Sequence, residues 1–327
     1  MSHARTLTLI FGLAITFVAV AASPSAAQVP PRFYWKTLVG TNAVPVIGMA
    51  MNGNANPIDP AHGVLADADF EGTLAIAGYA RTFAIFDRAA MAALLLPMGR
   101  VSGDVTLFGR TFDDEASGFG DPMIEFTLNI LGPKAIRNIP DLIRYEPGFS
   151  VDLLVDLAFP IGEYDDNQPL NLGQNRWYGR LAAPIVWQLG PWAPGRRTTL
   201  EGVPSIWIYS DNDDFVGRKL SADPKFQLEG HLTRDLMENI WASADVNWMY
   251  GGKSTLDGVS GDELNSVAVG FTLGMQVNEN LQLTASYVAT VNDNDDDDLQ
   301  MDGFRRSLVF GWHSLMEGMK RLEVGGH

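Results

Sequence analysis

The stretch FSVDLLVDLAFP, residues 149–160, decides the fold. Its odd-numbered positions are all apolar, whereas the even-numbered positions include Ser150, Asp152 and Asp156, with Leu154 as the exception. A period of two residues is typical of a β-strand with one apolar and one polar face. Strands of soluble proteins run about five or six residues, and a tilted strand that crosses a bilayer needs about 9–11. The stretch therefore predicts a strand with lipid on one face and a watery lumen on the other.

Further segments along the chain alternate in the same way. The clearest pair, 264–277 and 281–291, is joined by the short turn 278–280, which is typical of a hairpin. In the first candidate, Gly40, Pro45 and Gly48 interrupt the alternation. The predicted strands are 33–51, 71–86, 89–104, 121–132, 148–160, 174–189, 198–210, 224–234, 239–251, 264–277, 281–291 and 303–314.

The connections between these segments alternate between tight and long. Short turns face the periplasm and long loops face outward in bacterial outer-membrane barrels, and an even strand count returns the C-terminus to the periplasm. We therefore predict an all-β fold, a transmembrane antiparallel up-and-down barrel of about twelve strands. Aromatic residues near strand ends fit the girdles of such a barrel, although the core of a soluble sandwich is an alternative: Trp177, Trp187, Trp207, Trp248, Tyr250 and Trp312.

The first 27 residues have the pattern of a secretory signal peptide. Arg5 precedes an apolar run over 7–22, and the small residues 25–27 precede a cleavage position before Gln28. A membrane anchor is the alternative, but the run is short for a spanning helix and no basic cluster follows it. We expect residues 28–327 to form one barrel domain that ends in a short periplasmic tail.

Composition narrows the functional classes. The chain has no cysteine and a net charge of −16. An exported chain without disulfides depends on closed hydrogen bonding or a large core. Because nucleic acid requires a basic surface, we expect no nucleic-acid partner.

Acidic runs fall in the predicted outer loops. The longest, Asp293-Asn294-Asp295-Asp296-Asp297-Asp298, resembles the opening of a calcium loop. Asp298 stands where that loop requires glycine, and no glutamate follows at the last ligand position, so we interpret the run as a solvated loop that attracts cations by its field. We predict no specific metal site and no cofactor.

Charged residues on the polar faces of the strands define the predicted lumen. Such charges either pair or line water, because an isolated buried charge is costly, and rings of charge set the selectivity of pores. A salt-bridge network that fills the barrel and a transport pathway therefore both remain open. The candidate lumen-lining or solute-contacting residues are Glu125, Asp152, Asp156, Arg176, Tyr178, Arg180, Glu229, His231, Asp245 and Arg305.

The sequence lacks the residue patterns that an enzymatic role would need. Only His231 and His313 lie in predicted strands of the mature chain, and both fall on the polar faces. A barrel lipase needs a serine and a histidine together on the outer face near the membrane edge. No nucleophile elbow, zinc-protease motif or phosphate loop is present. We predict that the protein is not an enzyme.

Several glycine-rich motifs link the chain to a known family. They are GFGDP (118–122), FPIGEY (159–164), NLGQNRW (171–177), GGK (251–253) and DG (257–258). With them the chain resembles, over about residues 33–314, the proteobacterial outer-membrane proteins grouped under the MetA pathway of phenol degradation. One departure is the C-terminus, which lacks the terminal aromatic residue common in such barrels, so Phe310 and Trp312 would close the last strand.

The resemblance implies an outer-membrane protein that takes up aromatic or other hydrophobic compounds. We expect a monomeric channel for passive entry of such small solutes, in contact with outer-membrane lipid and lipopolysaccharide. A non-transporting structural or surface-binding barrel is the alternative, and a barrel-embedded lipase is a third reading. Nothing in the sequence names the solute.

Overall fold

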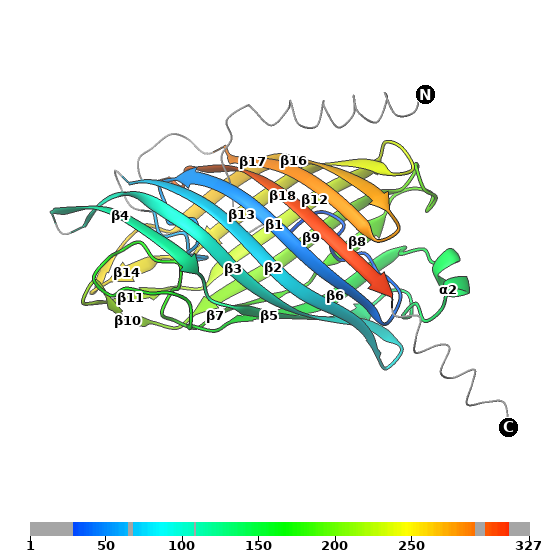
Figure 1. Cartoon of the computed structure of the whole chain (residues 1–327), viewed down its shortest axis with the longest axis horizontal. Coiled ribbons are helices and arrows are strands. Elements are labelled where there is room, and N and C mark those ends of the chain that lie inside the picture. Colours follow the sequence, from blue (N-terminus) through cyan, green and yellow to red (C-terminus); the bar gives the residue numbers. More distant parts are fainter. Residues whose placement is uncertain (1–28, 65–67, 108, 292–297, 314–327) are drawn as a thin grey trace.

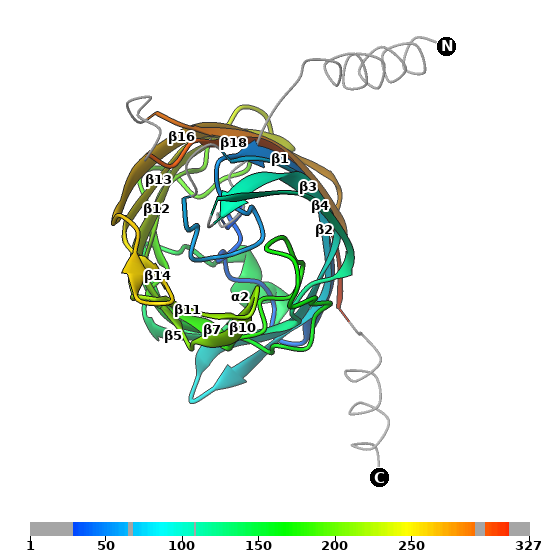
Figure 2. The ribbon, with the colours of Figure 1, turned by 90° about the vertical axis from the view of Figure 1, so that its left-hand side faces the viewer.

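The chain folds into a closed antiparallel barrel. The computed structural model describes residues 29–64, 68–107, 109–291 and 298–313. The barrel closes where β1 pairs with β18 along the full length of both strands (Figures 1 and 2). The wall contains β1 (Thr41–Gly53), β2 (Asp69–Ile85), β3 (Arg88–Leu107), β5 (Met123–Leu131), β6 (Phe149–Ala158), β7 (Tyr178–Ala182), β8 (Ile185–Gln188), β9 (Thr198–Tyr209), β12 (Lys225–Asp235), β13 (Ile240–Gly251), β16 (Leu264–Asn278), β17 (Leu281–Thr290) and β18 (Met301–His313).

The prediction of about twelve strands is confirmed, because the described wall has twelve strand positions. Strands β7 and β8 occupy one position in the wall, because both pair with β6 on one side and with β9 on the other. Ala183 and Pro184 separate them, so the segment predicted as one strand over 174–189 is two short ones. Proline cannot donate to a sheet ladder, which explains the interruption.

The two ends of the barrel differ, and we name them the tight-turn end and the long-loop end. At the tight-turn end, Phe86 and Asp87 join β2 to β3 with positive φ at both positions, the geometry of a two-residue hairpin turn. The same end carries the short helix α2 (Ile139–Ile143), within the predicted long connection 133–147. No helix among the described residues is long and apolar enough to cross a membrane.

Small strands build the long-loop end. The segment predicted as a loop over 105–120 is instead the end of β3 and the strand β4 (Arg110–Phe119), which pair beyond the rest of the wall. A separate sheet joins β10 (Asn212–Phe215), β11 (Arg218–Ala222), β14 (Ser254–Leu256) and β15 (Val259–Ser260), so two predicted outer loops are partly ordered. The predicted signal peptide, the C-terminal tail and the acidic run 293–297 lie outside the described residues.

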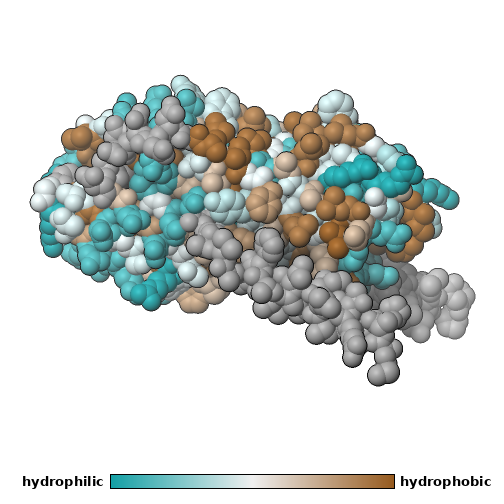
Figure 3. Space-filling model, turned by 90° about the horizontal axis from the view of Figure 1, so that it is seen from above, coloured by the Kyte–Doolittle hydropathy of each residue, from teal (hydrophilic) through white to brown (hydrophobic). Residues whose placement is uncertain are grey.

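Burial along the strands follows the predicted alternation. In β6, Phe149 is 48 % exposed and Asp152 is 2 % exposed, and the pattern continues to Ala158. Apolar side chains gather over the middle of the barrel, and hydrophilic ones cover the long-loop end on the left of Figure 3. Closure of the sheet lets the backbone N–H and C=O groups of the wall form hydrogen bonds with neighbouring strands, as a bilayer requires. The apolar exterior suits the surrounding lipid.

Aromatic rings mark both rims of this exterior. Trp187 packs on Phe149 near the tight-turn end, and Trp177 packs on Phe159 near the long-loop end, with ring centroids 6.4 and 5.2 Å apart. Trp207 was predicted for these girdles, but it points inward and its Nε1 donates to Gln227.

The glycine motifs of the sequence meet at one corner of the long-loop end. The Asp121 carboxylate accepts from the backbone N–H of Gly162 at 2.9 Å and of Gln174 at 2.8 Å. A Cβ atom on Gly162 would lie 2.6 Å from the carbonyl carbon of Gly120. Three motifs that are far apart in the sequence thus share a backbone contact in which a side chain has no room.

Replacing Gly162 with alanine is expected to destabilise this corner. The clash involves backbone on both sides, so relief requires main-chain movement, and overpacking of this kind costs about 1–3 kcal/mol. Gly48→Ala is the matched control, because a Cβ atom there would meet nothing within 4 Å. Thermal unfolding of the refolded barrels compares them, and equal midpoints for the two variants would contradict the corner contact.

Candidate functional site

The ten predicted lumen residues all point into the barrel. Their exposed fractions lie between 0 and 7 %. Their role in contacting a solute stays a prediction. They come from β5 (Glu125), β6 (Asp152, Asp156), the start of β7 and the residues before it (Arg176, Tyr178, Arg180), β12 (Glu229, His231), β13 (Asp245) and β18 (Arg305). His313, which the alternation also placed inward, is exposed at the end of β18.

A single arginine holds the centre of the lumen. The Arg180 guanidinium contacts Asp156 at 2.7 Å and Glu229 at 2.9 Å. Glu125 stands opposite Asp156 in the strand register. These side chains, which we call the central cluster, place three carboxylates around one cation. The middle of the barrel is therefore a polar site in which one guanidinium faces three carboxyl groups.

A second network starts at His231. Its Nδ1 lies 2.8 Å from Asp245, which also accepts from the hydroxyls of Ser243 and Thr272. A hydrolase would need a nucleophile, such as a serine hydroxyl, hydrogen-bonded to the histidine. Here the Ser243 hydroxyl donates to the aspartate, and Nε2 of His231 has no hydrogen-bond partner among the described residues. This arrangement fixes the imidazole but does not prepare a serine for attack.

The chain segment before β1 fills the lumen from the tight-turn end. The first predicted strand began at residue 33, but β1 begins at Thr41 and residues 29–40 run inside the barrel. We call them the N-terminal plug. Leu154, the exception to the alternation in β6, packs with Tyr34, which explains an apolar residue on a polar face. The sequence left open whether this segment enters the lumen.

Arg32 anchors the N-terminal plug. Its Nη1 lies 2.7 Å from Asp235, and its backbone N–H donates to Glu201 at 2.8 Å. The guanidinium also lies 4.3 Å from the ring of Trp35 and 4.5 Å from that of Trp241. A second anchor is the ion pair between Lys36 and Asp152. Glu201 and Asp235 were not among the predicted site residues, although both lie on polar faces.

The loop between β1 and β2 fills the lumen from the other end. We call residues 54–64 the loop plug. Asp59 contacts Arg176 at 2.6 Å, and His62, 2 % exposed, lies with its Nδ1 2.9 Å from the Lys225 ammonium. The carbonyl of Pro60 accepts from Tyr209 and from Lys225. The sequence placed His62 in a loop, and this loop folds into the barrel.

Apolar residues line the long-loop end beneath this loop. Phe70 and Leu74 of β2 face inward there, and Asp69, Glu71 and Thr73 face outward. This reversal is expected where a strand leaves the lipid and its outer face meets water. The inward residues form the outer apolar cluster. The sequence suggested a lumen that is polar throughout, whereas this end of the lumen is apolar. Its members are Met49, Met51, Phe70, Leu74, Val101, Val105, Leu107, Phe112, Leu170 and Leu172.

Acid is expected to release the loop plug. Burial, followed by the nearby Lys225 charge, lowers the pKa of His62 from 6.5 to about 3, although Asp59 acts in the opposite direction. The docked loop therefore binds fewer protons than a released loop, and its stability falls by about 1.4 kcal/mol for each pH unit below about 6.5. Single-channel currents should rise as the pH falls from about 6.5 to about 5.

The variant His62→Gln tests the assignment, since it keeps a polar side chain that does not titrate. Its currents should lose the acid response. An acid response equal to that of the unchanged protein would show that another group releases the loop.

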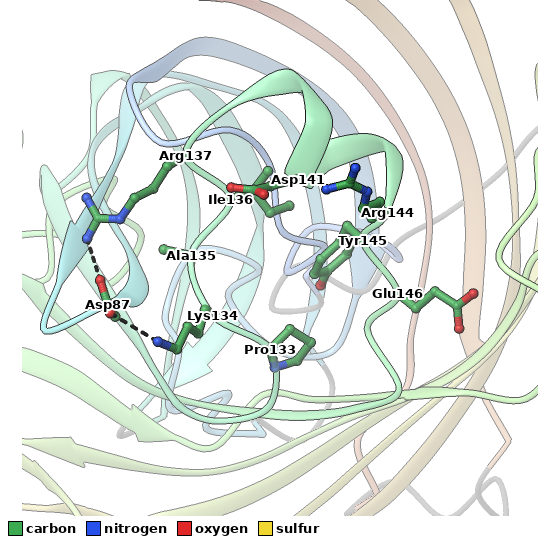
Figure 4. Close-up of a pocket in the computed structure, with 10 residues that line it drawn as sticks. All are labelled: Asp87, Pro133, Lys134, Ala135, Ile136, Arg137, Asp141, Arg144, Tyr145 and Glu146. Atoms are coloured by element: carbon green, nitrogen blue, oxygen red, sulfur yellow. Dashed lines mark hydrogen bonds and ion pairs between the residues drawn. The ribbon is translucent and has the colours of Figure 1, made fainter.

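A surface pocket of about 620 Å³ lies at the tight-turn end (Figure 4). Arg137 and Lys134 point at Asp87 there, with N–O distances of 2.9 and 3.3 Å, and lower the pKa of that carboxyl. The N-terminal plug leaves the barrel beside the pocket, where Val39 donates to the Ile136 carbonyl. The pocket is lined by Asp87, Pro133, Lys134, Ala135, Ile136, Arg137, Asp141, Arg144, Tyr145 and Glu146.

Among residues 29–64, 68–107, 109–291 and 298–313, no group of three or more histidine or acidic side chains is arranged to hold a metal ion.

Comparisons with known proteins agree with the fold. The family model described as "Putative MetA-pathway of phenol degradation" matches residues 53–306. Among solved structures, an outer-membrane channel from Pseudomonas putida F1, COG4313, is 22 % identical, with a TM-score of 0.67 over 87 % of this chain and 99 % of that one. The β-domain of the Bordetella autotransporter BrkA is 10 % identical, with a TM-score of 0.46 over 84 % and 100 % of the two chains. No curated protein matches the chain.

The exterior and the fold together give the location. The barrel is closed, its outer face is apolar, and aromatic rings border that face. These are the features of bacterial outer-membrane barrels, in which tight turns face the periplasm. The protein is an outer-membrane barrel, with α2 and both anchors of the N-terminal plug on the periplasmic half.

Proposed function

The chain belongs to the MetA-pathway of phenol degradation family, and we propose that it is a channel for passive entry of small hydrophobic or aromatic compounds. Diffusion down a gradient needs no energy-coupling part. We propose that the channel is a monomer, since the strands of one chain close the lumen.

The order in which apolar and polar surfaces follow one another along the lumen supports this proposal. Below the outer loops lies the outer apolar cluster, with Met49, Met51 and Phe70. Methionine side chains adapt to ligands of different shape. Further in, the central cluster offers charged hydrogen-bonding groups. An apolar entrance followed by a few polar groups is typical of small-molecule sites, and it suits a ring that bears a polar substituent.

A second candidate is a closed barrel with a structural role. Plugs at both ends of the lumen favour it, because Arg32 and Arg176 hold them by buried ion pairs. In that case the barrel would stabilise the envelope and conduct no solute.

Uptake by cells separates these two candidates. We would delete the gene and measure initial uptake of a radiolabelled aromatic compound at low concentration, with a small sugar as the control solute. The channel proposal expects slower uptake of the aromatic compound alone, restored by the unchanged gene and less by Phe70→Asn. Unaltered aromatic uptake, together with increased leakage of large dyes, would refute the channel and support the structural role.

A further inference from the structure

Tyr34 of the N-terminal plug fills a cradle in the barrel wall. Its side chain is 6 % exposed and belongs to one apolar cluster with Leu154, Ala182, Val186 and Val203, which we call the Tyr34 cradle. The four cradle residues come from β6, β7, β8 and β9. The wall therefore forms the cradle, and a segment held mainly by side-chain contacts supplies the ring.

The hydroxyl end of this ring meets charges. The Tyr34 hydroxyl is buried and has no hydrogen-bond partner among the described residues. Glu125 and Asp156 hydrogen-bond to each other through their carboxyl groups, and each oxygen of a carboxyl group has further lone pairs that can accept a second donor. Glu125, Arg180, Asp156 and Glu229 all act on the hydroxyl electrostatically. Burial raises the pKa of Tyr34 well above 10, so its hydroxyl stays neutral and able to donate. The central cluster thus offers acceptors that the tethered ring does not reach.

The missing hydrogen bond of the Tyr34 hydroxyl is informative, because buried polar groups are nearly always hydrogen-bonded. Tyr34 is constrained by Arg32 on one side and Lys36 on the other, both in ion pairs with the wall. A free ring of the same chemistry has no such constraint. It could keep the apolar contacts and move its hydroxyl to a carboxylate.

We propose that the Tyr34 cradle is a phenol-binding subsite of the lumen and that Tyr34 occupies it as an internal ligand, which an incoming phenol replaces when the N-terminal plug withdraws. This inference rests on the proposed channel function and names the solute class for it. A ring without a hydroxyl would leave the central cluster without a donor, and a polar solute without a ring would lose the apolar contacts. Sites built around a hydroxyl discriminate strongly against analogues that lack it.

Binding to purified barrels in detergent tests the subsite. The probe is p-cresol, which is the tyrosine side chain as a free molecule, and toluene is the comparison without a hydroxyl. Tyr34→Ala removes the ring but keeps Arg32 and Lys36 as anchors, whereas Tyr34→Phe keeps the ring in place. Calorimetry should show one p-cresol per Tyr34→Ala barrel, at least about tenfold tighter than toluene. Tyr34→Phe should bind p-cresol at least about tenfold more weakly than Tyr34→Ala.

Equal affinity of Tyr34→Ala for p-cresol and toluene would overturn the proposal, as would equal p-cresol affinity of the alanine and phenylalanine variants. If Tyr34→Ala does not assemble, a chain lacking residues 29–36 exposes the same cradle and takes its place. In the unchanged protein, p-cresol should increase hydrogen exchange at the Arg32 amide, while toluene should not. No change at Arg32 under saturating p-cresol would also overturn the proposal.

These readouts do not depend on transport. If the barrel binds p-cresol as expected, but cells without the barrel take up the aromatic compound equally well, the channel function is refuted and the subsite stands. A barrel that speeds aromatic uptake, with no preference for p-cresol in Tyr34→Ala, would refute the subsite alone.

Discussion

Replacing Arg32 with alanine is expected to release the N-terminal plug and raise the ion conductance of the barrel several-fold. The variant loses an ion pair with Asp235 at 2.7 Å and the contacts of the guanidinium with two indole rings. A hydrogen bond to a charged group contributes about 1.5–3 kcal/mol, and each cation–π contact adds at least about 0.5 kcal/mol. Together they shift the balance between docked and released plug by about 100-fold.

The barrel itself should survive this change. Asp235 keeps its contact with Arg197 at 2.8 Å and accepts from the backbone of Gly195, so no buried charge loses all partners. Arg196→Ala is the matched control, because it removes the same charge from an exposed side chain at the same end. Single-channel recordings in planar bilayers give the answer. Currents through Arg32→Ala that equal those of the control would show that the plug is held by other contacts.

The wall of the barrel was predictable from the sequence because its determinants are local. A strand at a lipid boundary must place apolar side chains at every second position, so the segment 149–160 alone reveals its outer face and its inner face. The same rule brought Asp152, Arg180 and Glu229 to the inside of the barrel. It also located the tight turns, since these interrupt the alternation for only two to four residues.

The plugs were not predictable in this way. Arg32 and Lys36 show no period, and their partners Asp235 and Asp152 lie more than 100 residues away in the sequence. The pairing exists only once the barrel has closed around the segment. One signal was present: the strand pattern sends more carboxylates than cations into the lumen, and a basic, aromatic segment before the first strand can balance them. Leu154 was the other signal, because an apolar residue on the inner face implies a neighbour to cover it.

The outer apolar cluster was missed for a related reason. The alternation was interpreted with one polarity over the whole length of each strand, although β2 and β3 extend beyond the lipid. In β2, Glu71 and Thr73 face outward while Phe70 and Leu74 face inward, which is the pattern of a soluble barrel. The register of the sheet does not change there, but the solvent around it does. A change of polarity along one strand therefore marks the membrane boundary.

Replacing Arg180 with alanine is expected to have the largest effect on stability. Its removal leaves Asp156 and Glu229 without their ion-pair partner, beside Glu125, at sites that are 5 % exposed or less. Removing one member of a buried ion pair costs about 3–5 kcal/mol, because the remaining charge stays buried. Arg100→Ala is the control: its ion pair with Glu115 is exposed, and such pairs contribute about 0–1 kcal/mol. Thermal unfolding of the refolded proteins should separate the two variants clearly.

The cause of that loss can be tested in the same background. If uncompensated charge is responsible, adding Asp156→Asn and Glu229→Gln to Arg180→Ala should restore most of the lost stability, because amides of the same size bury at lower cost than carboxylates. If the loss instead reflects the missing packing of the guanidinium on Trp207, 5.2 Å from its ring, the added substitutions should restore nothing. Only the first result fits a lumen in which one arginine offsets several carboxylates. In such a lumen, the acceptors that hold Arg180 are also the groups that a phenolic hydroxyl would meet.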